Sequence, residues 1–362
     1  MKKKYMAFIA AASVAAVLAF GYACSSYKNY YKIMAVTGAT PLAVKQDLKK
    51  DVSLEVSGNT KRVYKFDEDS LNAFASVYFR TMEVAPDGKF EGTYRYTGIP
   101  VLHILEGVAP EKPKDAAFDR PLDMVVTFIS SSGKQSHFSY GELTMTDDTR
   151  PVILAYSRKG LAASKATPEK PYTLNKHKDD VTGLRLVCPG DKDTARYLDD
   201  VKKIVLRDVN VDNSVLPEML AGFKCYAHSV NTVYKKQILP LNLQGADPAS
   251  VENWLRTGHG QGYKGISSAK GFNLRSVLRK NFPGAGENNY FLFVACDGYR
   301  SLFSGREIFS TDAGKDMMIM KEFDGTDARG GTSVAPVRDY YVDREIWGLS
   351  HIVMIDSVND LK

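Results

Sequence analysis

The sequence predicts an α+β protein of two tandem, related domains, each of mixed β structure with short helices, after an N-terminal signal segment. Three observations favour this class: an uncharged apolar stretch near the N-terminus, alternating apolar residues typical of strands, and a set of motifs that occurs twice in the same order. The 362 residues, 44% of them hydrophobic, suffice for two cores, because a single core stops growing at roughly 250 to 300 residues.

The segments are expected where the sequence pattern changes along the chain. Residues 1–24 read as an export or lipoprotein signal and residues 25–50 as a connector. The first domain is expected at residues 51–210 and the second at residues 237–362, with a linker at residues 211–236 between them.

The N-terminal segment has the three parts of an export signal. Lys2, Lys3 and Lys4 are followed by an uncharged apolar stretch that ends at Ala23 and Cys24. This end resembles a bacterial lipoprotein signal, in which Cys24 would become the lipidated first residue. An uncleaved signal anchor and a plain cleaved signal are the alternatives, and all three predict an extracytoplasmic or periplasmic chain. A lipid or an anchor would make the membrane a partner.

Charge and short motifs exclude several classes of function. The formal net charge of +6 includes the three lysines of the signal, and the remaining +3 is too small to favour nucleic acid as a partner. The six histidines form no HxH or HExxH pattern, and no serine lies in a GxSxG elbow. A zinc protease and a serine hydrolase of the elbow type therefore have no support.

Three cysteines lie beyond the signal segment, at Cys188, Cys225 and Cys296. None belongs to a CxxC or CxxCH motif, so the sequence gives no support to zinc, iron–sulfur or c-type haem sites. In an oxidising compartment, an odd number of cysteines allows one disulfide and leaves one thiol. The sequence leaves the pairing open.

The strongest internal signal is a GxxxxFSxxE motif that occurs twice. It spans Gly133–Glu142 in the first half and Gly298–Glu307 in the second, and each copy follows a run typical of a strand. Further landmarks agree on both sides. Upstream, Gly98 and Gly271 each precede apolar residues with helical spacing, and downstream an arginine lies eight residues before an isoleucine in both halves.

Each position of the motif has a structural reason. The glycine supplies the positive φ that a hairpin turn needs, and the phenylalanine is expected to return to the core on the partner strand. Ser139 and Ser304 precede Glu142 and Glu307 by three residues, which is the spacing of a capping box at the start of a short helix. The motif thus predicts a hairpin that leads into a capped helix.

These stretches together resemble the molybdopterin-binding domain of the sulfite oxidase family, more weakly in the second half. The resemblance implies a molybdenum ion held by a pterin dithiolene and by one cysteine thiolate, since a soft sulfur ligand suits this metal. The matching segments of the first half are Leu54–Gly58, Tyr96–Leu105, Val126–Leu143, Pro151–Tyr156, Gly183–Asp191 and Arg196–Leu206.

The cysteine that the family pattern requires is absent from both halves. It would lie upstream of the Gly98 segment, yet residues 67–97 and the corresponding residues 250–270 contain no cysteine. Buried or disulfide roles are expected for the cysteines that lie elsewhere. We therefore predict no metal ligand.

Molybdopterin could still bind without that ligand, through its phosphate. The resemblance places Arg185, Lys192 and Arg196 near the cofactor, where basic side chains could hold it. The alternative is ordinary surface charge, or ion pairs with Asp191 or Asp199.

A glycine-rich stretch at residues 258–265 resembles a phosphate loop only superficially. It lacks the GK[ST] ending, and the preceding residues Val251–Arg256 are expected to form a helix rather than a strand. A flexible connector is the favoured interpretation.

The leading hypothesis is an extracytoplasmic binding or assembly protein on a molybdopterin-oxidoreductase-like scaffold, without bound molybdenum and with a protein partner. The alternative is a periplasmic molybdopterin-dependent oxidoreductase with an unusual metal ligand. A third hypothesis concerns packing: the two domains would lie about a pseudo-two-fold axis, as two copies do in a homodimer.

Overall fold

The fold is that of a computed structural model, which describes residues 48, 52–146, 150–161, 181–209, 211–218, 225–258, 260 and 262–358. The predicted signal with Cys24, and the connector apart from Leu48, lie outside the described residues. In the part of the chain that is described, no helix has the length and apolar character needed to cross a membrane.

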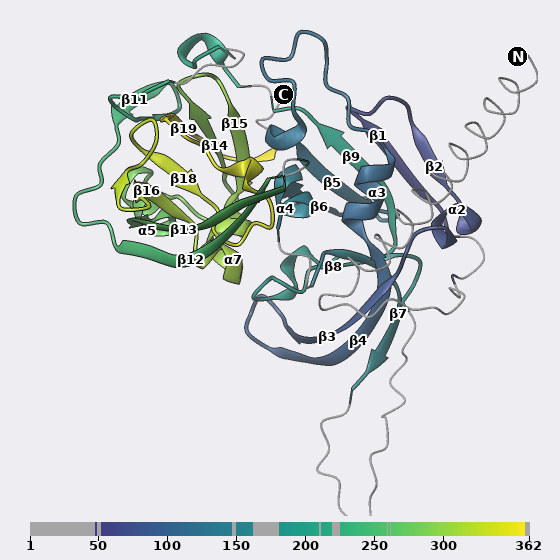
Figure 1. The fold of residues 1–362 in the computed structure, drawn as a ribbon. Coiled ribbons are helices and arrows are strands. Elements are labelled where there is room, and N and C mark those ends of the chain that lie inside the picture. Colours follow the sequence, from purple (N-terminus) through teal and green to yellow (C-terminus); the bar gives the residue numbers. More distant parts are fainter. Residues whose placement is uncertain are drawn as a thin grey trace, which may run out of the picture.

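Two sheets form the N-terminal half, drawn in blue and teal in Figure 1. One has the strand order β2-β1-β9-β5-β6 and the other the order β3-β4-β7-β8. The strands are β1 (Leu54–Gly58), β2 (Tyr64–Phe66), β3 (Val77–Val84), β4 (Phe90–Pro100), β5 (Val125–Ser130), β6 (Gln135–Ser139), β7 (Ile153–Gly160), β8 (Arg185–Val187) and β9 (Val201–Arg207). The helices are α2 (Glu68–Asn72), α3 (Val101–Gly107) and α4 (Tyr140–Thr144), with 3₁₀ turns η1 (Pro121–Asp123), η2 (Thr194–Arg196) and, after β9, η3 (Asn213–Val215).

Two sheets also form the C-terminal half. Their orders are β11-β10-β19-β14-β15 and β12-β13-β16-β17, with β18 paired to β16. The strands are β10 (Asn231–Tyr234), β11 (Gln237–Pro240), β12 (Pro248–Gly258), β13 (Gly262–Asn273), β14 (Tyr290–Ala295), β15 (Arg300–Ser304), β16 (Met318–Phe323), β17 (Thr326–Asp327), β18 (Ser333–Ala335) and β19 (Leu349–Ile355). The helices are α5 (Leu274–Asn281), α6 (Gly305–Ser310) and α7 (Asp312–Lys315), with the turn η4 (Val342–Arg344).

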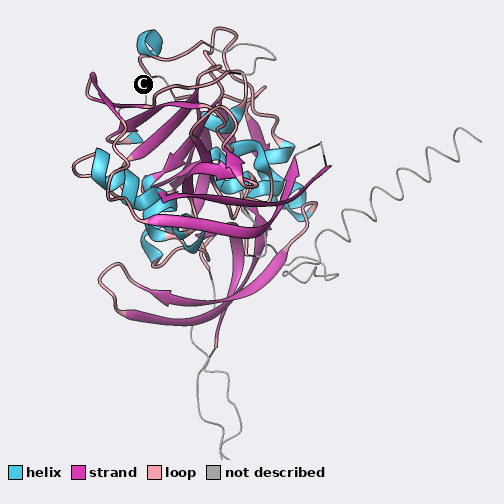
Figure 2. Ribbon diagram, turned by 60° about the vertical axis from the view of Figure 1, so that its left-hand side comes forward, coloured by secondary structure: helices cyan, strands magenta, loops and turns pink. Residues whose placement is uncertain are grey.

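The first sheets of the two halves share one topology and one register. In each, the first strand runs parallel to the last strand, β1 with β9 and β10 with β19. Ile204 of β9 lies opposite Phe128 of β5, and Ile352 of β19 lies opposite Phe293 of β14. Figure 2 shows sheets joined by few, short helices, in agreement with the predicted α+β class.

The hairpin predicted from the repeated motif is confirmed in both halves. Gly133 and Gly298 have the same positive φ of 81° at the turns β5–β6 and β14–β15. Phe138 and Phe303 are fully buried. Each ring packs edge-on against a phenylalanine of the preceding strand, with centroids 5.5 and 5.4 Å apart.

The helices predicted after Gly98 and Gly271 are also confirmed, as α3 and α5. Both glycines lie where two strands approach closely. A Cβ on Gly98 would stand 2.5 Å from the carbonyl oxygen of Leu154, and one on Gly271 would stand 1.9 Å from that of Ile319. The repeated glycine is therefore a packing requirement of the second sheet in each half.

The helix predicted for Val251–Arg256 is wrong, because these residues belong to strand β12. A register shift against β13 lies between Val251 and Trp254, where Asn253 adopts a positive φ of 54°. The extra residue of this bulge turns Trp254 back toward the inside. Val251, Trp254 and Leu255 thus acquire the i, i+3, i+4 spacing of a helix while forming a strand.

The segment 211–236, which we expected as a linker, includes β10. This strand pairs with β19 and so belongs to the sheet of the C-terminal half. The sheet therefore begins before residue 237. Periodicity over only four residues was too short to reveal the strand.

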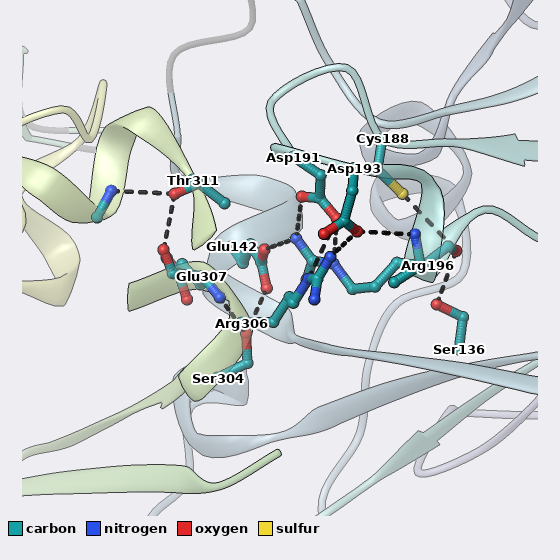
Figure 3. Close-up of polar contacts among 12 residues, drawn as sticks. Ser136, Glu142, Cys188, Asp191, Asp193, Arg196, Ser304, Arg306, Glu307 and Thr311 are labelled. Carbon is teal, nitrogen blue, oxygen red and sulfur yellow. Dashed lines mark hydrogen bonds and ion pairs between the residues drawn. The ribbon is translucent and has the colours of Figure 1, made fainter. Parts of the chain in front are cut away.

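The predicted capping boxes are half right. The hydroxyls of Ser139 and Ser304 do cap their helices, accepting from the backbone N–H of Glu142 at 3.1 Å and of Glu307 at 3.0 Å. Each glutamate side chain, however, crosses to the other half. Ser139 Oγ donates to Glu307 Oε2 at 3.1 Å. Ser304 Oγ donates to Glu142 Oε2 at 3.0 Å (Figure 3). We call the region where these four side chains meet the seam between the halves. Its reciprocal contacts are those expected of a pseudo-two-fold axis.

Each buried glutamate also pairs with an arginine, and a buried aspartate holds that arginine from another side. The Arg–Glu distance is 2.6 Å in both halves. Each guanidinium lies over the phenylalanine of its own motif, 4.1 and 4.5 Å from the ring centroid. The two sets are Glu142–Arg196–Asp191 and Glu307–Arg344–Asp339.

We predict that Arg344→Ala lowers the free energy of unfolding by about 3–5 kcal/mol, because it leaves Glu307 and Asp339 buried without their cation. Arg338→Ala is the control, since its side chain is 66% exposed and pairs with Asp316 at the surface. It should cost less than about 1 kcal/mol. Urea unfolding measures both, and equal losses would contradict the role given to the seam.

Candidate functional site

A cavity of about 510 Å³ is lined by residues from both halves. Its size lies within the usual range for small-molecule sites, about 300–1,000 Å³. Its lining combines three aromatic rings, three guanidinium groups and several acidic side chains. The rings are those of Tyr299, Phe323 and Trp347, and the guanidinium groups are those of Arg120, Arg256 and Arg329.

Arg256 forms part of one wall of this cavity, where its charge is neutralised by a carboxylate. Its guanidinium pairs with the buried carboxylate of Glu345 through Nε at 3.0 Å and through Nη2. Trp347 Nε1 donates to the same carboxylate at 2.9 Å. Burial raises the pKa of Glu345, and the hydrogen bonds from Arg256 and Trp347 oppose this rise. The ion pair of Arg256 and Glu345 therefore holds the aromatic wall in place, and the guanidinium of Arg256 is not free to bind a ligand.

The N-terminal half contributes Arg120 to the lining of this cavity. It lies over the ring of Tyr299, 5.1 Å from the centroid, and its Nη1 is 3.4 Å from the phenol oxygen. Burial raises the pKa of Tyr299 to about 12, so the phenol stays protonated and donates to the carbonyl of Asp343 at 2.6 Å. Phe118 packs edge-on against the same ring at 5.3 Å.

The loop that carries Arg120 is held by a buried ammonium. Lys112 Nζ donates to the carbonyl oxygen of Phe118 at 2.7 Å and pairs with Asp123 at 2.6 Å and with Asp208 at 2.7 Å. Burial raises the pKa of Asp123 to about 7, although Lys112 opposes the rise. This anchor sets where Arg120 meets the C-terminal half.

Two cations of the cavity remain available to a ligand. Arg120 and Arg329 are exposed, and neither pairs with a carboxylate among the described residues. Arginine binds carboxylate, sulfonate or phosphate oxygens through a planar fork of donors. The site can therefore take an anionic group beside aromatic walls.

A disulfide between Cys225 and Cys296 stands beside the cavity, of which Cys225 is a lining residue. It resolves the pairing that the sequence left open, and Cys188 remains as a buried thiol. Gly348 lies against the bridge: a Cβ there would stand 3.0 Å from Cys296 Sγ and 3.3 Å from Cys225 Sγ. The backbone N–H of Cys296 donates to the carbonyl of Gly348 at 2.9 Å.

Two of the residues predicted near a cofactor, Lys192 and Arg196, lie at the seam (Figure 3 labels Arg196). Arg196 is buried and pairs with Asp191 and Glu142, so a phosphate would have to displace two carboxylates. Lys192 pairs with Glu287 of the other half and is 55% exposed.

Arg185, the third of these residues, belongs to a different cluster. It bonds to Asp199, its Nη2 is 3.9 Å from Glu83, and its guanidinium lies 5.5 Å from the centre of the Tyr197 ring. All three cations therefore have carboxylate partners, and none of them lines the cavity described above. Their role toward a cofactor stays a prediction.

The donor set does not fit the molybdenum centre that the family resemblance implies. Burial raises the pKa of the Cys188 thiol well above its usual value, which keeps the sulfur protonated. The other two described cysteines share the disulfide. Within the described ranges, no group of three or more His, Cys, Asp or Glu side chains is arranged to hold a metal ion.

The glycine-rich stretch at residues 258–265 gave the one sequence signal for the cavity, since Gly258 and Lys264 line it. The stretch is not the connector that we expected, because Gly258 ends β12 and residues 262–265 begin β13. The arginines of the cavity gave no such signal. Arg120, Arg256 and Arg329 lie in three separate segments without a shared spacing. The landmarks Gly298 and Arg344 are each followed directly by a lining residue, Tyr299 and Glu345, which is the only hint that the repeat contained.

No family model matches the chain, and no curated protein is similar to it in sequence. Among solved structures, the chain is similar to the crystal structure of the sulfane dehydrogenase SoxCD from Paracoccus pantotrophus, with 13% sequence identity and a TM-score of 0.31. The similarity covers 84% of this chain and 80% of that chain. It is a distant resemblance.

We predict that Gly348→Ala destabilises the protein more than Gly325→Ala. Both glycines have positive φ, 65° and 76°, so both substitutions carry the backbone strain of about 1–2 kcal/mol. A Cβ on Gly325 meets nothing within 4 Å, whereas one on Gly348 contacts the disulfide. The expected excess in urea unfolding is about 1–3 kcal/mol. Equal losses would show that the bridge can move aside.

We predict that Asp123 makes stability fall as pH rises from about 5 to 7. In the folded chain its pKa is about 7, whereas the unfolded value is near 4, so the folded state binds more protons in this interval. The difference in unfolding free energy between wild type and Asp123→Asn should fall by up to about 1.4 kcal/mol per pH unit. Asp119→Asn, on the exposed part of the same loop, is the control, and a flat difference for Asp123→Asn would refute the assignment.

Proposed function

We propose that this chain is an extracytoplasmic binding or assembly protein that binds an organic anion in the cavity between its two halves. One observation carries the proposal. Arg120 and Arg329 line a single cavity together with three aromatic rings, and neither pairs with a carboxylate among the described residues. A ligand with an aromatic or apolar body and a carboxylate, sulfonate or phosphate group matches this lining.

The chemistry of the sulfur atoms supports binding without molybdenum. A cysteine-ligated molybdenum needs an accessible thiolate, and the described cysteines provide a buried thiol and a disulfide. The distant likeness to a sulfane dehydrogenase is compatible with an oxidoreductase-like scaffold, but contributes no residue to the site.

The location and the domain organisation belong to the same proposal. A disulfide persists in oxidising compartments, which supports export, and the sequence before Cys24 supports a lipid or membrane anchor. The shared strand order supports two related tandem domains, the second of which includes β10. The sequence resemblance described above supports the sulfite oxidase type.

We predict saturable binding of 8-anilinonaphthalene-1-sulfonate, which carries aromatic rings and a fixed negative charge, to the full chain. Arg329→Ala should raise its Kd about tenfold, because a charged hydrogen bond contributes about 1.5–3 kcal/mol and 1.4 kcal/mol is a factor of ten. Fluorescence titration measures the change. Added salt should weaken binding to the wild type more than to the variant.

The matched control is Arg80→Ala, which removes an exposed arginine of β3 outside the cavity and should leave the Kd unchanged. Equal binding by wild type and Arg329→Ala would contradict the site. Stoichiometric molybdenum in protein purified from its native host would contradict the function and favour the oxidoreductase.

A further inference from the structure

A second cavity, of about 650 Å³, runs along strand β12, whose last residues also line the cavity proposed to bind an anion, called the anion cavity below. One side is formed by consecutive residues of this strand, from Ala249 to Leu255. The other side is formed by residues 315–316 and 337–340. Seven residues of extended chain span about 23 Å, so the cavity is a slot along a strand rather than a round pocket.

The strand side of this slot is an open sheet edge. In Figure 1, β12 lies at the outer margin of the C-terminal half, and it is the terminal strand in the order β12-β13-β16-β17. No described residue pairs with its outer edge, where alternate residues direct N–H and C=O groups away from β13. An unpaired edge is a template for another extended chain.

The opposite side of the slot is held in place. The backbone N–H of Tyr340 donates to the carbonyl of Met145 in the N-terminal half at 2.7 Å. Asp339 is fixed by the buried Arg344, and Arg338 Nε donates to Asp316 at 2.6 Å, which joins the two segments of this side. Because this side is already ordered, the protein loses little conformational entropy when a ligand fills the slot.

The slot has an apolar floor and polar rims. Trp254 and Met318 are 6% and 1% exposed and line the cavity together with Val337. Glu252 on the strand side is exposed, as are Lys315 and Arg338 on the opposite side. This lining suits a chain whose alternate side chains face inward and outward.

We infer that the slot beside β12 is a docking site for a short extended peptide, which adds to the sheet as an extra strand and places an apolar side chain over Trp254. Backbone hydrogen bonds provide the affinity in this mode, and the floor provides the selectivity. The bulge at Asn253 divides the edge into short straight stretches. Such a stretch can pair with a short peptide but disfavours a second copy of the chain, because sheet-to-sheet pairing requires a long, flat edge.

The test selects ligands for the full chain from a random heptapeptide library displayed on phage. Binding of a labelled selected peptide is then measured by fluorescence anisotropy. Replacing single peptide N–H groups by N-methyl should weaken binding at least tenfold at alternate positions within the stretch that pairs with β12 on one side of the bulge, because only alternate residues of that stretch face β12. A peptide bound through side chains alone would lack this period of two.

Protein variants locate the docking site. Of Ser250 and Val251, adjacent in β12, one directs its N–H toward β13 and the other outward. We expect one of Ser250→Pro and Val251→Pro to keep the wild-type melting temperature and to weaken peptide binding at least tenfold. Ser250→Ala, which retains the N–H, is the matched control and should bind normally.

Three outcomes would overturn the inference. The first is that no heptapeptide is enriched, and the second is that the folded proline variant binds as the wild type does. The third is a dimer without peptide, observed by sedimentation and lost in the same proline variant, which would assign the edge to a second copy of the chain.

Discussion

Two carboxylates buried between the halves determine how the rest of the molecule is arranged. Glu142 and Glu307 have almost no contact with water, and an unpaired buried charge costs several kcal/mol. Each carboxylate obtains one donor from an arginine of its own half and one from a serine of the other half. Separating the halves would remove a donor from both carboxylates at once.

The same constraint positions the two candidate binding sites. Arg344, which neutralises Glu307, lies in a turn whose neighbours serve other purposes. The next residue, Glu345, anchors Arg256 in the wall of the anion cavity, and Tyr340, just upstream, forms the fixed side of the slot beside β12. Gly348 ends the segment against the disulfide. One short stretch of chain therefore links the seam, both cavities and the bridge.

The sequence predicted what depends on neighbouring residues and missed what depends on distant ones. The hairpin and the serine caps follow from spacings within ten residues, and both were confirmed. The path of each glutamate was not predictable, because the serine it contacts lies more than 160 residues away. The strand β12 was mistaken for a helix because Asn253 breaks its period of two. The cavity arginines come singly from distant segments, with no pattern to mark them.

The exchange of donors across the seam makes the two halves depend on one another. Ser139 and Glu307, one from each half, form one hydrogen-bonded unit, and Ser304 and Glu142 form the other. A change at the serine of one half leaves the buried glutamate of the other half short of a donor, so the effects of substitutions at the two positions of a unit are coupled and do not add. Neither half retains both donors of its own glutamate when it is separated from the other.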